Sequence, residues 1–243
     1  MLEESASNNK EKLVKFNSGG NIASSIIIIP ARRGSKRLPD KNVMPLGGVP
    51  LILHSINYAK ANKNLIDRIF ISTDDPRAKM IALKEGIEVI DRPLYLGDDN
   101  ASTVSALKHV LETIEKEVEN VILLQPTNPL RPKNLLTEAF QKFESGGYDS
   151  LMTVTRSFQK FGSIKKDRFV PFNYKMGQRS QDLDPLYYEN GLLYITKASL
   201  ILDEKILGEN NFSFIVDHPF AKVDIDVQED LDYAEFMLSK RDK

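Results

Sequence analysis

Short runs of β-branched residues alternate with amphipathic segments along most of the chain. Residues 25–29 form the first run, a serine and four isoleucines that stops at Pro30, which is typical of a strand buried on both faces of a parallel sheet. Leu51 to Ala61 then spaces its apolar residues for one helix face, and Ile69 to Ile71 is a second short buried strand. The order strand, loop, helix, strand is that of a parallel β-α-β unit.

The same alternation continues to about residue 145. Asp75 precedes Pro76, which predicts a helix capped by the aspartate, and Gly86 marks the end of that helix. The further elements that we expect are strands at 88–90 and 121–124 and helices at 103–117 and 132–145. The chain therefore predicts an α/β fold with a doubly wound, mostly parallel sheet.

The pattern changes at the start of the chain and after residue 148. Residues 1–24 lack periodicity and end in turn formers, so we expect a flexible N-terminal extension before one domain at 25–243. From 149 onward helical periodicity disappears, and short strands at 150–155 and 192–195 flank a polar, aromatic stretch. This suggests an arm inserted at about 149–190, followed by a last helix near 228–239.

Composition narrows the classes of function. The 243 residues include 41% hydrophobic residues, enough for one domain with a small lobe, and no cysteine, so any metal must be bound by oxygen or nitrogen. The 33 basic and 34 acidic residues give a net charge of -1, which provides no electrostatic reason to expect nucleic acid or an acidic membrane as a partner. No apolar run is long enough to span a bilayer, and we expect a soluble, cytoplasmic protein.

A basic loop, ARRGSKRLPDKN at residues 31–42, follows the first strand. Ligands of open α/β sheets bind at the carboxyl ends of the strands, where this loop should lie. Gly34 and Ser35 would let backbone N–H groups approach an anion, and the arginines and lysines would neutralise a polyphosphate. The loop lacks the spacing of the P-loop and of the dinucleotide fingerprint. The alternative is an ordinary solvated basic loop, but its place at a strand end favours a nucleoside triphosphate site.

Two carboxylates near the carboxyl terminus form a second candidate site. Asp224 and Asp226 are separated by Ile225, so an extended backbone would put both side chains on one side. Two such oxygens can hold Mg²⁺ against substrate phosphates. Spacing alone favours the alternative, an exposed edge strand followed by a capping aspartate.

Five segments occur in one order across nearly the whole chain beyond residue 25: IIIIPARRGSKRLPDKN at 26–42, ISTDD at 71–75, LLQPTNPLR at 123–131, YENGLLYIT at 188–196 and VDID at 223–226. Together they resemble the CMP-sialic acid synthetases (N-acylneuraminate cytidylyltransferases), including the CMP-legionaminic and CMP-pseudaminic acid synthetases. The resemblance implies a Rossmann-like nucleotidyltransferase that moves CMP from CTP to the anomeric hydroxyl of a sialic-acid-like nonulosonic acid, for surface glycan synthesis. It also implies a homodimer held by the arm.

The resemblance further implies a role for each matching residue. Arg32 and Lys41 would be catalytic, because they would offset charge that develops on the phosphates. The implied nucleotide site is Ala31, Arg32, Gly34, Ser35, Lys41 and Asn42. The implied sugar site is Gln125, Arg179, Gln181, Glu189 and Asn190. Asp224 and Asp226 would be the metal pair, for Mg²⁺ or Mn²⁺.

Two positions depart from the family pattern. Ser180 stands where a second arginine often precedes the glutamine, and Tyr188 stands where some bacterial members place an arginine. Both positions face the sugar in the family, so N-acetylneuraminic, legionaminic and pseudaminic acid all stay open as substrates. Two further alternatives are a cytidylyltransferase for 3-deoxy-octulosonate and a non-catalytic nucleotide-binding module.

Overall fold

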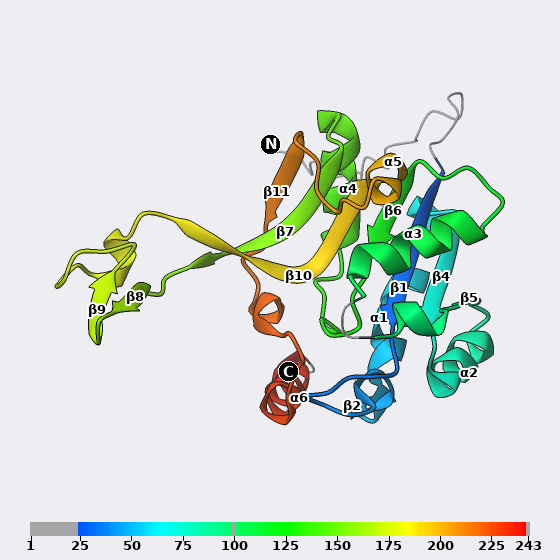
Figure 1. Ribbon diagram of the computed structural model, residues 1–243, viewed down its shortest axis with the longest axis horizontal. Coiled ribbons are helices and arrows are strands. Elements are labelled where there is room, and N and C mark those ends of the chain that lie inside the picture. The colour runs from blue at the N-terminus through cyan, green and yellow to red at the C-terminus, as the bar shows by residue number, and fades with distance from the viewer. Residues whose placement is uncertain (1–23, 99–100, 242–243) are drawn as a thin grey trace, which may run out of the picture.

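The computed structural model describes residues 24–98 and 101–241, so the extension expected at 1–24 lies, except for its last residue, outside the described residues. The centre is a seven-stranded sheet (Figure 1). Its strands lie in the order β11 (Asn211–Ile215), β7 (Ser150–Ser157), β10 (Leu186–Lys197), β6 (Asn120–Leu123), β1 (Ser25–Ala31), β4 (Arg68–Thr73) and β5 (Glu88–Asp91). Strand β10 is antiparallel to its two neighbours, and the other neighbouring pairs are parallel. The prediction of a mostly parallel α/β sheet is confirmed.

Helices cover both faces of this sheet. On one face, α1 (Leu51–Ala61), α2 (Pro76–Lys84) and α4 (Leu135–Gly146) pack against Ile27 and Ile29 of β1. On the other face, α3 (Thr103–Thr113) and α5 (Ala198–Leu202) pack against Ile26 and Ile28. Strand β1 is therefore buried on both faces, as its run of isoleucines predicts, and the sheet is doubly wound.

Strand β1 does not stop at Pro30, contrary to expectation, but continues to Ala31 beside β4. Pairing of β1 with β6 ends at Ile28, whose carbonyl accepts a hydrogen bond from the Leu124 N–H at 3.1 Å. Backbone directions repeat every second residue along a strand, so the nitrogen of Pro30 points to the same side as the Ile28 carbonyl, toward β6. Pairing with β6 has already ended there. The missing N–H of proline therefore costs no ladder hydrogen bond.

Three other boundaries differ from the sequence-based expectation by three residues or more. Helix α3 ends at Thr113, because Ile114 is extended and packs into the core instead of continuing to residue 117. Helix α4 begins at Leu135, after a turn in which the Leu135 N–H bonds to the Pro132 carbonyl at 3.1 Å. Strand β10 begins at Leu186, six residues before the expected strand at 192–195.

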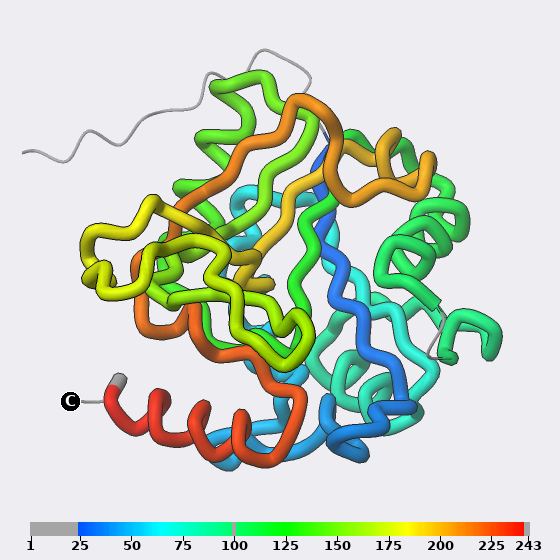
Figure 2. Tube along the Cα trace, turned by 60° about the vertical axis from the view of Figure 1, so that its left-hand side comes forward, coloured from blue at the N-terminus to red at the C-terminus, as the bar shows by residue number. Residues whose placement is uncertain are grey.

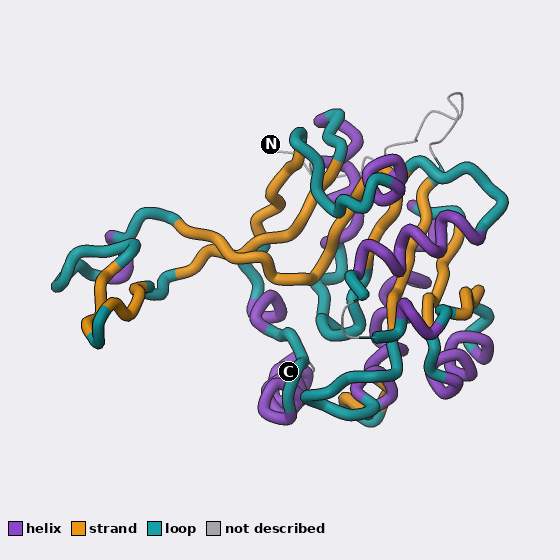
Figure 3. The backbone as a smooth tube through the Cα atoms, viewed as in Figure 1, coloured by secondary structure: helices purple, strands orange, loops and turns teal. Residues whose placement is uncertain are grey.

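The segment expected to form an arm extends away from the sheet (Figure 1). Strands β7 and β10 run together beyond the body of the molecule, and a small hairpin of β8 (Gly162–Lys165) and β9 (Arg168–Pro171) lies at the far end (Figure 3). Large apolar side chains on this arm are exposed, including Ile164, Phe169 and Phe172. The arm therefore carries apolar surface that the described part of the chain does not cover.

The last helix, α6 (Gln228–Arg241), lies beside the short strands β2 (Pro45–Leu46) and β3 (Val49–Pro50) that precede α1 (Figure 2). The Gly47 N–H donates to the Glu235 carboxylate at 2.7 Å. This contact joins the last helix to the turn between β2 and β3, which follows the basic loop. No helix in the described ranges is long and apolar enough to cross a membrane.

Candidate functional site

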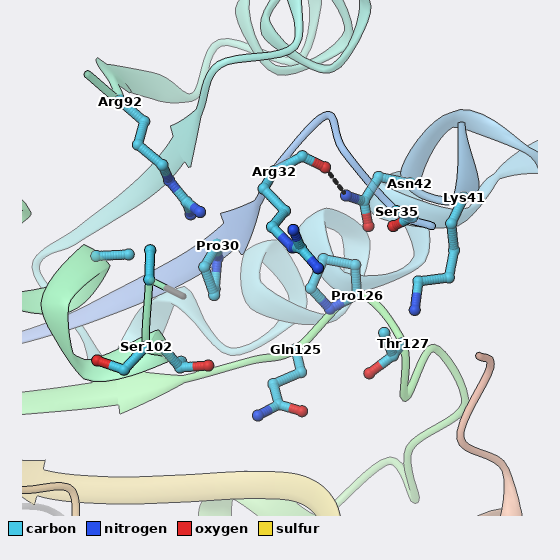
Figure 4. Close-up of a pocket in the computed structure, with 13 residues that line it drawn as sticks. Pro30, Arg32, Ser35, Lys41, Asn42, Arg92, Ser102, Gln125, Pro126 and Thr127 are labelled. Atoms are coloured by element: carbon cyan, nitrogen blue, oxygen red, sulfur yellow. Dashed lines mark hydrogen bonds between the residues drawn. The ribbon is translucent and has the colours of Figure 1, made fainter. Parts of the chain in front are cut away.

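A cavity of about 190 Å³ opens at the carboxyl ends of β1 and β6. The chain leaves β1 toward β4 on one side, and β6 lies on the other, so this is the point where the strand order reverses. Open α/β sheets bind ligands in the crevice at such a point. The lining residues are Pro30, Arg32, Ser35, Lys41, Asn42, Arg92, Ala101, Ser102, Thr103, Ala106, Gln125, Pro126 and Thr127 (Figure 4).

The basic loop supplies one wall of the cavity. The Asn42 amide donates to the Arg32 carbonyl at 2.9 Å, which ties the start of the loop to its end (Figure 4). The Lys41 ammonium donates to the Ile225 carbonyl and to Asp226, both at 2.9 Å. Both Lys41 and Asn42 are buried, and this burial fixes their side chains where a ligand would meet them.

Two residues expected in the nucleotide site lie at its margin. Ala31 is buried, and its carbonyl accepts a hydrogen bond from the Thr73 hydroxyl at 2.5 Å, so it holds the loop in place. Gly34 lines a second hollow of about 520 Å³ that adjoins the cavity and shares Ser35 with it. Any contact of Ala31 or Gly34 with a nucleotide would be made by the backbone.

Sequence reasoning missed Arg92 and Ser102, which line the opposite wall. Arg92 directly follows β5 and donates to the Ser72 carbonyl at 3.0 Å; burial lowers its pKa, and the charge of Arg32 lowers it further, while Asp74 opposes both. Ser102 accepts from the Ser105 N–H at 3.2 Å and so caps α3, whose positive end faces the cavity. Both carried a usable signal, since Arg92 follows a strand and Ser102 precedes a helix.

Asp224 and Asp226 lie in a loop before α6, not in a strand. Asp230 accepts from the Asp226 and Val227 N–H groups at 2.9 and 3.0 Å and is therefore the capping aspartate. The alternative of an edge strand followed by a cap at this pair is wrong. Asp226 instead accepts from Arg37 at 2.6 Å and from Lys41, which places it against the basic loop.

The electrostatics of the two carboxylates fit a divalent cation. Desolvation and the charge of Asp226 raise the pKa of Asp224, although part of its side chain stays exposed, and Thr127 and Lys41 only partly offset this. Burial would also raise the pKa of Asp226, but Lys41 and Arg37 hold it below its ordinary value. The negative charge of Asp224 is only partly offset by the protein. A Mg²⁺ or Mn²⁺ ion bound by the oxygen atoms of both carboxylates would neutralise it.

Gln125 follows β6 and lines the cavity between the two walls. Its carbonyl accepts from Arg131 at 2.8 Å, and Arg131 also donates to the Leu192 carbonyl at 2.7 Å and to the Ser55 hydroxyl at 3.0 Å. Arg131 is buried, which lowers its pKa to about 10. This arginine joins the loop after β6 to β10 and α1, and nothing in the local sequence distinguishes it from a surface arginine.

Glu189 and Asn190 lie where β10 leaves its regular pairing with β7. The Asn190 amide donates to the Thr155 hydroxyl at 2.9 Å, and its oxygen accepts from the Thr153 hydroxyl at 2.6 Å and from the Leu192 N–H at 3.1 Å. The Tyr194 hydroxyl donates to Glu189, and burial together with this bond raises the pKa of Tyr194. Asn190 thus uses its side chain within the protein, whereas Glu189 stays exposed.

Arg179 and Gln181 are on the arm. Both are exposed, and Arg179 pairs with Asp182 through bonds of 2.7 and 3.0 Å. Neither is among the described residues that line the cavity of the same chain. Their assignment to a sugar site stays a prediction.

Asn190→Ala is expected to lower the free energy of unfolding by about 2–4 kcal/mol, because it removes three buried hydrogen bonds, to the Thr153 and Thr155 hydroxyls and the Leu192 N–H. Denaturant unfolding measures this change. Asn173→Ala is the matched control, since Asn173 makes a comparable pair of backbone hydrogen bonds on the exposed arm. Equal losses for the two variants would contradict a special structural role for Asn190.

The sequence is similar to those of known proteins. Residues 26–241 match the cytidylyltransferase family. The chain is 34% identical over 213 residues to an N-acylneuraminate cytidylyltransferase of Streptococcus agalactiae serotype V, covering 84% of this chain and 51% of the relative. It is 33% identical over 224 residues to a pseudaminic acid cytidylyltransferase of Campylobacter jejuni, covering 88% of this chain and 95% of that protein.

The fold also resembles a solved structure of CMP:2-keto-3-deoxy-manno-octonic acid synthetase in complex with CTP. The TM-score is 0.67 at 18% identity, and the similarity covers 90% of this chain and 100% of the other. The chain spans about half the length of the streptococcal relative. The family match over most of the sequence and these identities show that the chain belongs to the cytidylyltransferase family.

Proposed function

We propose that this protein transfers CMP from CTP to the anomeric hydroxyl of a nonulosonic acid and releases pyrophosphate. The observation that carries the proposal is the cavity at the end of β1, where Arg32, Lys41 and Gln125 face one space. The Asp224/Asp226 pair does not itself line that space, but it adjoins Lys41, since Asp226 is bonded to Lys41 among the described residues. Cationic groups and a pair of carboxylates on one crevice suit a nucleoside triphosphate with its metal ion.

The basic loop would hold the triphosphate. Lys41 has three donors and gives two to Ile225 and Asp226 among the described residues, which leaves one for a phosphate oxygen. Arg32 lines the cavity beside it and would offset the charge that develops on the α-phosphate. Arg92 and the amino end of α3 add positive potential on the opposite wall. A divalent cation bound by Asp224 and Asp226 would neutralise further phosphate charge.

In the proposed reaction, the anomeric oxygen forms a bond to the α-phosphorus while the bond from that phosphorus to the bridging oxygen of pyrophosphate breaks. The hydroxyl proton is lost to a base. The protein contributes position and charge compensation, which account for most of the rate enhancement in transfers of this type. Gln125 is fixed through its carbonyl by Arg131, so its amide can orient the sugar acid beside the triphosphate.

The nonulosonic acid is supported by the relatives, one named for N-acylneuraminate and one for pseudaminic acid. We further propose a homodimer in which the arm of each protomer reaches the partner's site. Exposed Ile164, Phe169 and Phe172 supply apolar surface for such an interface. Arg179 and Gln181, which do not line the cavity of their own chain, would then meet the sugar acid bound to the partner.

Pyrophosphate release tests the reaction. We expect release from CTP and Mg²⁺ with N-acetylneuraminic, legionaminic or pseudaminic acid, and much slower release with 3-deoxy-octulosonic acid. UTP and ATP serve as nucleotide controls. Binding of CTP without release for any acid would overturn the transferase and leave a nucleotide-binding module.

A further inference from the structure

The end of β4 and the residues that follow it touch the basic loop at three points. The Thr73 hydroxyl donates to the Ala31 carbonyl at 2.5 Å, where the loop begins. Asp74 accepts from the Arg33 N–H at 2.8 Å, near the middle. Arg77 donates to Asp40 at 2.5 Å, immediately before the residues that enter the cavity. Residues 73–77 therefore form a brace along the whole loop.

Asp40 is the strained point of this loop. Its φ of 59° and ψ of 17° place it in the left-handed region, which disfavours residues with a side chain by about 1 kcal/mol. Its carbonyl accepts from the Val43 N–H at 2.9 Å and starts the short turn η1 (Lys41–Val43). The conformation of Asp40 therefore sets the direction in which Lys41 and Asn42 leave the backbone.

Arg77 is itself held in place from α2. Its backbone N–H and its Nε both donate to Asp75 Oδ1, at 2.9 and 3.2 Å, and a terminal nitrogen donates to Asp75 Oδ2 at 3.1 Å. Asp75 is buried at the amino end of α2, and its backbone N–H donates to the Thr73 hydroxyl at 3.0 Å. The guanidinium that reaches Asp40 is thus anchored to the sheet.

We propose that Arg77 is a positioning residue for the nucleotide loop: it holds Asp40 in the left-handed conformation from which Lys41 and Asn42 enter the site. Both charged groups are about half exposed, 44% for Arg77 and 55% for Asp40, so the ion pair adds little to global stability. Its effect is local, because it fixes one backbone conformation and not the fold. The hydrogen bond from Arg77 also holds the pKa of Asp40 below its ordinary value.

The test is a double-mutant cycle with Asp40→Gly, because glycine adopts a positive φ without help from a partner. We expect Arg77→Gln to weaken CTP binding about three- to tenfold in the Asp40 background and less than about twofold in the Asp40→Gly background. Calorimetry with CTP and Mg²⁺ measures the binding. The KM for the sugar acid should change less than the KM for CTP, because Gln125 and the arm lie outside the brace.

Hydrogen exchange of the ligand-free protein gives a second readout. In Arg77→Gln, the amides of Val43 and Met44 should exchange faster than in the parent, and Asp40→Gly should remove that difference. Lys79→Gln is the matched control. Lys79 lies on α2, as Arg77 does, and the change breaks its exposed ion pair with Asp91 without touching the loop. Equal effects of Arg77→Gln in both backgrounds, or no effect in either, would overturn the proposal.

This inference rests on the proposed function only for its binding readout. If the parent protein fails to bind CTP, the proposed function fails, while the exchange experiment still decides whether Arg77 positions the loop. If CTP binds but exchange at Val43 and Met44 is the same in every variant, the brace fails and the proposed function stands.

Discussion

Asp226→Asn is expected to slow pyrophosphate release from CTP at least about a hundredfold. The change removes an anionic oxygen from the proposed metal pair, and it also removes the partner of Arg37 and the carboxylate that orients Lys41. The Mg²⁺ concentration for half-maximal rate should rise at the same time, because Asp224 alone would have to hold the ion. Steady-state rates across a Mg²⁺ titration, together with Mn²⁺ binding to the CTP-free protein, measure both effects.

Asp232→Asn is the matched control for this prediction. Asp232 is an exposed carboxylate at the start of α6 that bonds to Gln228 at 2.9 Å and makes no contact with the basic loop. It should leave the rate and the Mg²⁺ dependence unchanged. If Asp226→Asn keeps more than about a third of the parent rate with the same Mg²⁺ dependence, Asp226 does not bind the metal.

The sheet and the basic wall of the cavity could be predicted because local sequence determines them. Four isoleucines in a row require burial on both faces, and the basic loop must then lie at the end of a strand. Arg32, Lys41 and Asn42 accordingly line the cavity, and Lys41 bonds to the carboxylate pair from the far end of the chain. The family resemblance assigned Lys41 and the two aspartates to one site, but neither it nor the spacing predicted that Lys41 and Asp226 would bond to each other.

The buried polar contacts could not be predicted, because they depend on which segments meet in the folded chain. Arg131 looks like a surface residue in the sequence, yet it bonds to β10, to α1 and to the start of its own loop after β6. Asn190 was expected to bind the sugar, but its side-chain partners are Thr153, Thr155 and the backbone of β10. An asparagine has the same chemistry in either role, and only its neighbours distinguish them.

The arm shows a different limit of sequence reasoning. The loss of helical periodicity indicated its position, and the structure gives β8 and β9 at its end, but a single chain does not say what the exposed apolar residues meet. In a symmetric dimer in which each arm completes the other site, every site contains residues of both protomers, and this can be detected in the kinetics of mixed dimers. Two defects on the same site need not lie on the same protomer.

Subunit complementation tests directly whether each site contains residues of both protomers. Lys41→Met and Arg179→Ala should each lose at least about thirtyfold in kcat/KM for the sugar acid, since one removes the proposed phosphate contact and the other the proposed contact with the sugar carboxylate. If the arm acts on the partner's site, an equal mixture after subunit exchange should recover about a quarter of the parent activity, because half of the dimers are mixed and each has one intact site. A mixture of Lys41→Met with Asp226→Asn should recover nothing, since Lys41 and Asp226 meet within one chain and each change therefore disables the site of the protomer that carries it. If the first mixture also recovers nothing although light scattering shows dimers, Arg179 acts within its own chain.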